Sequence, residues 1–185
     1  FGRRQFRLSN TEIERLIAYQ VSASVGMASL TGTRVTHVKP HGAISNMACA
    51  DVGMAAAIMR GIKAVDHSLI LLSPAKSELI NEARKAGFSV AEELFADRAY
   101  MPDGQLAPRS RPDAMIHDPE ASLAHVMRMF AEGEVLCVDG TVIPMDGQSV
   151  CVHGDGPTAA ATAQHIRRGL EAAGLEMCSL EEICR

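Results

Sequence analysis

Apolar residues recur along this chain in two alternating patterns, one typical of helices and one typical of strands. After the Ser9-x-x-Glu12 capping pattern, Ile13, Ile17 and Val21 follow at helical spacing. Short apolar runs such as 69–72 are typical of strands buried on both faces. The pattern predicts helices at 9–32, 51–65, 77–86, from 118 onward, and 156–174. It predicts strands at 35–38, 69–72, 88–95, 135–138, 141–143, 149–152 and 175–180.

Strands that alternate with helices of ten or more residues indicate βαβ units and a parallel sheet, so the expected fold class is α/β. Asp139-Gly140, between two of the short runs, predicts one antiparallel hairpin. The parallel sheet could be an open doubly wound sheet or a (β/α) barrel. In both architectures ligands lie at the carboxyl ends of the strands.

Polar side chains follow three of the predicted strands, at the point where each strand ends. Those after the first strand are Lys39, His41 and Asn46, those after the third are Asp97, Arg98 and Tyr100, and those after the strand at 149–152 are His153 and Asp155. Because the carboxyl ends of parallel strands share one edge of a sheet, we expect these groups to converge on an active site.

Several of these residues have a second interpretation. His37 could move a proton, or it could be a core histidine between Val35 and Val38. Asp97 and Arg98 could line a site, or form an ion pair that holds the long loop after them. Asp155 could act on a ligand or cap the following helix, and a cap and an anion site use the same amide groups.

Composition narrows the function classes. The 185 residues are 47% hydrophobic and 22% charged with a net charge of -4, as in a protein with one core-forming domain. There is no Trp and no basic run, which argues against a nucleic-acid surface. No apolar run approaches the roughly 18 residues that span a bilayer. Five cysteines without CxxC spacing predict a reduced, cytoplasmic protein.

The sequence also lacks several well-known catalytic motifs. It has no GxxxxGK[ST] loop for phosphates, no GxGxxG after a strand, no GxSxG elbow and no HExxH helix. Histidine, aspartate, lysine and arginine are present at the predicted strand ends without an obvious Ser or Cys nucleophile. This combination favours acid/base or metal-assisted hydrolysis over acyl-enzyme chemistry.

Three motifs carry a resemblance to a known family. They are Lys39-Pro-His-Gly-Ala-Ile-Ser-Asn46, Phe95-Ala-Asp-Arg-Ala-Tyr-Met-Pro-Asp-Gly104 with Pro108-Arg-Ser-Arg-Pro112, and Val150-Cys-Val-His-Gly-Asp155. In this order they resemble the LamB/YcsF family, which includes lactam-utilisation proteins and the A subunit of the prokaryotic 5-oxoprolinase. The resemblance covers essentially the whole chain.

The resemblance implies a (β/α) barrel of the glycoside hydrolase and deacetylase type. It implies ATP-dependent opening of 5-oxo-L-proline to L-glutamate together with subunits B and C, with ATP as a magnesium-bound co-substrate and no tightly bound cofactor. Catalytic roles would fall to Lys39, His41, His153 and Asp155, and substrate binding to Asn46, Asp97, Arg98 and Tyr100. Whether a metal takes part is left open.

Two further expectations concern the extent of the chain and its activity. Family members carry an additional N-terminal segment rich in Asp, His and Asn. We therefore expect residues 1–185 to form one α/β domain that is shortened at its N-terminus, with sheet edges that favour association with a second copy. The alternatives to a 5-oxoprolinase component are a metal-dependent deacetylase or carbohydrate hydrolase, and a non-catalytic partner-binding subunit or inactive fragment.

Overall fold

The computed structural model describes residues 4–154 and 156–184. These residues cluster into two compact units. The first holds the described residues up to Ala91 together with those from Leu180 onward, and the second is Glu92–Ser179. The expectation that residues 1–185 form one domain stays a prediction, and the two units are described in turn.

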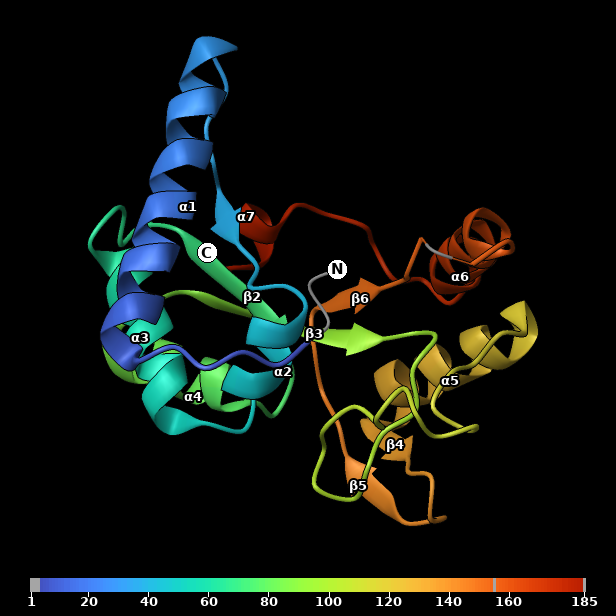
Figure 1. Cartoon of the computed structure of the whole chain (residues 1–185). Helices are drawn as coiled ribbons and strands as arrows, with labels where there is room; N and C mark the ends of the chain where they lie inside the picture. The colour runs from blue at the N-terminus through green and yellow to red at the C-terminus, as the bar shows by residue number, and fades with distance from the viewer. Residues whose placement is uncertain (1–3, 155, 185) are drawn as a thin grey trace. The chain divides into compact units, whose positions relative to one another are not determined.

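Among the described residues, the first unit contains most of the parallel strands and five helices, three of which follow the predicted order (Figure 1). Its elements are α1 (Asn10–Leu30), β1 (His37–Val38), α2 (Ala43–Ala48), α3 (Val52–Lys63), β2 (Ile70–Pro74), α4 (Glu78–Ala86), the start of β3 (Val90–Phe95) and α7 (Leu180–Ile183). β1 and β2 pair in parallel, with His37 opposite Ile70 and Val38 opposite Leu71.

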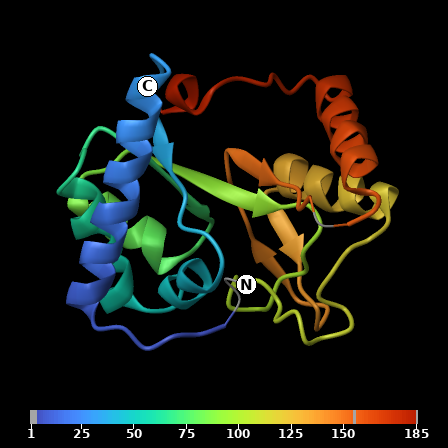
Figure 2. The ribbon, with the colours of Figure 1, turned by 45° about the horizontal axis from the view of Figure 1, so that its top comes forward.

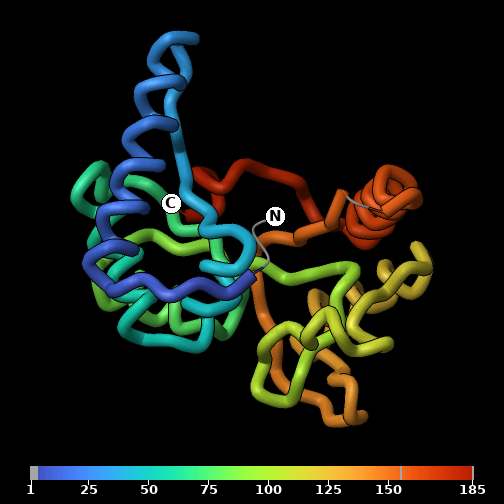
Figure 3. The backbone as a smooth tube through the Cα atoms, viewed as in Figure 1, coloured from blue at the N-terminus to red at the C-terminus, as the bar shows by residue number. Residues whose placement is uncertain are grey.

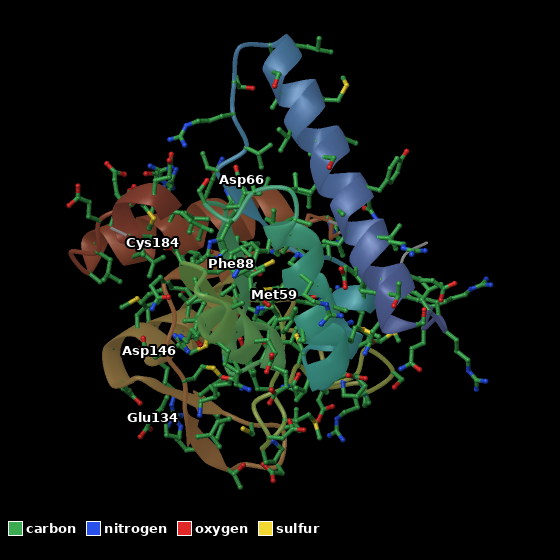
Figure 4. The ribbon with its side chains drawn as sticks, turned by 90° about the vertical axis from the view of Figure 1, so that its left-hand side faces the viewer. Met59, Asp66, Phe88, Glu134, Asp146 and Cys184 are labelled. Carbon is green, nitrogen blue, oxygen red and sulfur yellow. The ribbon has the colours of Figure 1, made fainter. Side chains whose placement is uncertain are left out.

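β2 is buried on both faces, as its apolar run predicts. Leu71 belongs to a core cluster with residues of α1, α3 and α4, which includes Met59 and Phe88 (Figure 4). Leu72, one residue further, belongs to a separate cluster with Ile70 and Ala91, against which α7 packs through Leu180 and Cys184. Alternate residues of one strand therefore support two helical layers.

Three helices of the first unit, α1, α3 and α4, begin where their capping residues predict. Ser9 Oγ accepts the Glu12 amide at 3.3 Å, and the Glu12 carboxylate accepts the Ser9 amide at 2.8 Å, so both halves of the capping box are present. Asp51 caps α3 through the Met54 amide at 2.9 Å, and Ser77 caps α4. Gly87 ends α4 in the left-handed conformation with φ of 83°.

The second unit contains the end of β3, two long helices and a hairpin. Its elements are α5 (Pro119–Glu132), β4 (Glu134–Leu136), β5 (Val142–Pro144), β6 (Ser149–Cys151) and α6 (Ala159–Ala172). β3 and β6 are parallel, with Phe95 opposite Cys151. α5 and α6 lie side by side (Figure 2), and Gly169 of α6 lets the Leu123 side chain of α5 approach closely. The long connection 96–118 runs from β3 to α5 (Figure 3).

The hairpin predicted at Asp139-Gly140 is confirmed; β4 is one residue shorter than the predicted strand, and β5 has the predicted length but begins one residue later. β4 and β5 pair antiparallel, with Val135 opposite Ile143. Gly140 has φ of 86°, and the Asp139 carboxylate accepts the Thr141 amide at 3.0 Å. The turn is therefore fixed by one glycine and one aspartate, as turn chemistry requires.

One predicted element is wrong, and one observed helix has no counterpart in the sequence-based prediction. No strand forms at 175–180; residues 175–179 have no regular structure and Leu180 begins α7. The Leu175 amide closes the end of α6 by donating to the Leu170 carbonyl at 3.0 Å, and Leu175 and Met177 are exposed. The short helix α2 is not predicted by the sequence, because nothing in Ala43–Ala48 has clear helical periodicity. The α/β class with parallel strand pairs is confirmed, and it is compatible with the barrel-like prediction.

Candidate functional site

The register of β3 and β6 brings Asp97 and His153 together. Phe95 and Cys151 are opposite each other, so the residues two positions further lie at the same carboxyl edge. His153 Nδ1 lies 2.8 Å from Asp97 Oδ1 and 3.0 Å from Oδ2. The backbone amide of His153 also donates to Asp97 Oδ2, at 3.1 Å. The prediction that these two strand ends share a site is thereby realised within the second unit.

The electrostatics of the pair favour an ionised carboxylate. Burial by itself would raise the pKa of Asp97, but the hydrogen bonds and the charge of His153 outweigh it, and the pKa of Asp97 is lowered. An ionised carboxylate can only accept, so Nδ1 of His153 is the donor. In the neutral imidazole Nε2 is then the atom that accepts a proton.

Asp97 and His153 line a pocket of about 310 Å³ in the second unit. Arg109 and His117 contribute polar side chains from the long connection, and both residues are exposed. The start of α6 lines the same pocket, including Thr158 and Thr162, and the side chain of its N-cap Thr158 makes no capping hydrogen bond. A carboxylate-oriented histidine, one guanidinium and a helix N-terminus therefore meet in a small pocket that suits an anionic ligand.

Arg98 and Tyr100 do not line this pocket; they hold the long connection in place. Arg98 is 6% exposed and donates to the carbonyls of Ala107 at 2.6 Å and Ala114 at 3.4 Å. Tyr100 is 2% exposed, and its hydroxyl oxygen accepts the Phe95 amide at 2.9 Å. Burial raises the pKa of Tyr100, which removes it from acid/base chemistry near neutral pH. These contacts support the interpretation that Arg98 holds the long loop. It does so through backbone carbonyl groups of that loop.

Lys39 and His41 line a different pocket, of about 470 Å³, in the first unit. His37 and Arg4 line it too, together with apolar residues of α1 such as Leu16. His37 is exposed, and its Nδ1 lies 2.9 Å from Thr36 Oγ1, so the core-histidine interpretation is wrong. Pro40 is buried directly between the two basic residues and anchors the loop that carries them.

The other two predicted site residues are Asn46 and Asp155. Asn46 is exposed on α2 and is not among the residues that line the 470 Å³ pocket. Asp155 lies outside the described residues, so its predicted role and its predicted cap both stay predictions. Within residues 4–154 and 156–184, no group of three or more His, Cys, Asp or Glu side chains could hold a metal ion.

Sequence reasoning missed three basic pocket residues. Arg109 lies inside the motif at 108–112, which is the available signal, but nothing in that motif distinguishes its side chain from its neighbours. His117 precedes the helix cap Asp118, and this position predicts a surface residue. Arg4 is remote in sequence from the Lys39 loop, and only the tertiary structure brings it to the same pocket.

The cysteines and the helices give two further observations. Cys49 is buried, and that burial raises the pKa of its thiol to about 11, so it is not a nucleophile at neutral pH. None of the five cysteines, all within the described residues, forms a disulfide. Among the described residues, every helix is too short or too polar to cross a membrane.

Comparison with known proteins gives consistent results over nearly the whole chain. It is 47% identical over 180 residues to the A subunit of the 5-oxoprolinase of Methylococcus capsulatus, covering 97% of this chain and 69% of that protein. It is 45% identical over 183 residues to the corresponding 5-oxoprolinase subunit of an Azoarcus species, covering 99% of this chain and 72% of that protein.

A solved structure and a family profile agree with these sequence relatives. The crystal structure of a lactam utilization protein from Thermus thermophilus superimposes with a TM-score of 0.86 at 40% identity, covering 95% of this chain and 70% of that one. The profile of the LamB/YcsF family matches residues 1–185. The chain belongs to the LamB/YcsF family.

Proposed function

We propose that this chain is the A subunit of an ATP-dependent 5-oxoprolinase, which hydrolyses 5-oxo-L-proline to L-glutamate together with subunits B and C. The observation that carries the proposal is the Asp97–His153 pair in the wall of a small pocket. Relatives that match nearly the whole chain bear the name of the 5-oxoprolinase A subunit, which supports the choice of substrate. We place the activity in the cytoplasm, where ATP is available and thiols stay reduced.

The chemistry needs both activation of the amide and proton transfer. The amide of a five-membered lactam is resonance-stabilised, so its carbonyl carbon is a poor electrophile. Transfer of the terminal phosphoryl group of ATP to the carbonyl oxygen would release ADP and make the carbonyl carbon a good electrophile. Water can then attack that carbon while His153 Nε2 takes a proton from the water. The ring opens when the C–N bond breaks and the ring nitrogen takes up a proton, and hydrolysis of the resulting acyl phosphate gives L-glutamate and inorganic phosphate. Asp97 fixes the tautomer of His153 and stabilises the imidazolium that forms.

The pocket of the second unit also offers what a small anionic substrate needs. 5-Oxo-L-proline carries one carboxylate, and Arg109 with the N-terminus of α6 would hold it by charge-assisted hydrogen bonds. The pocket volume of about 310 Å³ is at the small end of the roughly 300–1,000 Å³ range of ligand sites. Magnesium enters this scheme with ATP as part of the co-substrate.

Lys39 and His41 take a different role from the one that the loop first suggested. They belong to the pocket of the first unit, and we assign them to binding an anion rather than to proton transfer. Arg98 does not bind the substrate in this scheme, because its guanidinium donates to two loop carbonyls. Asp155 and Asn46 keep their predicted roles as hypotheses.

The test is lactam-dependent ADP release and glutamate formation by the chain with subunits B and C added. His153→Ala should lower the turnover rate by about 100- to 10,000-fold, the usual contribution of a positioned acid/base group. His165→Ala is the matched control, because His165 lies on α6 in the same unit and pairs with Glu120 outside the pocket. Equal rates for the two variants would sink the proposal.

A further inference from the structure

The pocket of the first unit has no part in the proton transfer proposed above, yet it gathers an unusual set of side chains. Arg4, His37, Lys39 and His41 all line it. Among the described lining residues there is no Asp or Glu, although the whole chain carries a net charge of -4. Basic groups that gather in a hollow attract an anion, and several such groups suit one with more than a single charge.

Apolar side chains make up most of the rest of the pocket lining, together with the polar residues Gln20 and Ser24 of α1. Leu16, Ile17 and Val21 line the pocket from α1, and Val35 and Ile44 line it from the β1 loop and α2. Ile17 and Val21 are also part of the core of the unit, so this wall is held by packing rather than by a loose surface. A ligand that fits this pocket has an apolar, ring-like part as well as a charged part.

Two of the basic residues, Lys39 and His41, lie on a constrained stretch of backbone. Lys39 precedes Pro40, which restricts its backbone to extended conformations. Pro40 is itself buried, and Gly42 follows with φ of 77°. Gly42 thereby leads the chain directly into α2. Lys39 and His41 lie on either side of Pro40, whose position is fixed by its burial. Side chains placed in this way lose less entropy on binding a ligand.

From this charge distribution and this apolar wall, we propose that the pocket of the first unit binds a nucleoside triphosphate. Lys39, His37, His41 and Arg4 contact the phosphates, and the base and ribose lie against Leu16, Ile17 and Val21. The identification of the ligand as ATP rests on the proposed 5-oxoprolinase function. The site contains side-chain cations in place of the phosphate-binding loop that the sequence lacks. Its volume of about 470 Å³ exceeds the 310 Å³ of the pocket that we assign to the lactam.

Isothermal titration calorimetry of the full chain with magnesium ATP tests this site. Tripolyphosphate and adenosine, titrated separately, represent the charged and the apolar half of the ligand. ATP should bind more tightly than either half. Lys39→Gln should weaken ATP binding about tenfold or more, since a hydrogen bond to a charged group is lost. Leu16→Gln should weaken ATP binding and leave tripolyphosphate binding unchanged.

Lys85→Gln is the matched control. It removes the same charge from the same unit, and Lys85 pairs with Glu82 on α4 instead of lining the pocket. Thermal unfolding of each variant verifies that it is folded, and His41→Gln provides a second test if Lys39→Gln is not. ATP binding that is absent, or equally weak in Lys39→Gln and Lys85→Gln, overturns the inference.

The same titrations separate this inference from the proposed function. His153→Ala should bind ATP as the unmodified chain does, because His153 lines the pocket of the second unit. If ATP binds through Lys39 but no lactam is hydrolysed with the partner subunits present, the nucleotide site stands and the proposed reaction fails. If lactam is hydrolysed while ATP binding is insensitive to Lys39 and His41, the reaction stands and the nucleotide site fails.

Discussion

Replacing Gly61 with alanine should destabilise the first unit by forcing α1 away from α3. A Cβ at Gly61 would lie 2.6 Å from the Glu14 carbonyl oxygen and 2.9 Å from Ile17 Cβ, both on α1. Since the carbonyl oxygen belongs to a helix backbone, it cannot swing aside as a side chain can. Overpacking of this kind typically costs about 1–3 kcal/mol, and we expect the upper half of that range. The better helix propensity of alanine offsets about 1 kcal/mol.

The net loss of about 1–2 kcal/mol should lower the melting temperature by about 2–8 °C for a chain of this size. Gly26→Ala on α1 is the control, because an added Cβ there has nothing within 4 Å. It should raise stability by up to about 1 kcal/mol through helix propensity alone. Thermal unfolding followed by circular dichroism measures both. A Gly61→Ala protein that melts at or above the temperature of Gly26→Ala would refute the close α1–α3 approach.

Three other changes have defined outcomes. Arg98→Ala should lower the urea midpoint, because the Ala107 carbonyl loses its guanidinium donor, which costs about 1–3 kcal/mol, whereas the Ala114 carbonyl keeps the Ala99 amide. Iodoacetamide at mildly alkaline pH should label exposed Cys178 long before Cys49, whose pKa is about 11, as peptide mass spectrometry can show. Burial lowers the pKa of His125 in the folded state, so the unfolded chain takes up the proton first as the pH falls below about 6.5. Stability should therefore decrease between pH 7.5 and 5.5, by less in His125→Phe, as urea denaturation would show.

Elements with local chemical signals were predictable from the sequence. The Ser9–Glu12 capping box starts α1, and Asp139-Gly140 forms the hairpin turn. The contact between Asp97 and His153 also follows from simple reasoning, because both residues come two positions after paired residues of parallel strands. The cap and the turn are each determined by a short stretch of sequence, whereas the Asp97–His153 contact is determined by the register of two parallel strands.

Other features depend on which way a side chain turns, and the sequence does not contain that information. Asp97 and Arg98 are adjacent, yet Asp97 lines the pocket and Arg98 donates to loop carbonyls. Tyr100 has the chemistry of a catalytic group but is buried as a support for the backbone of Phe95. Arg4 joins the pocket of Lys39 only through tertiary packing. Recurring apolar residues predict a strand at 175–180, but Leu175 instead closes the end of α6.

The central claim is that Asp97 and His153 act as one catalytic unit. A double-mutant cycle tests it most directly, with the rate of lactam-dependent glutamate formation measured for Asp97→Asn, His153→Ala and the double variant, with the partner subunits present. If Asp97 acts through His153, the double variant will be about as slow as His153→Ala alone, because the orienting group has nothing left to orient. If the two single losses multiply in the double variant, the residues act independently and the claim is wrong.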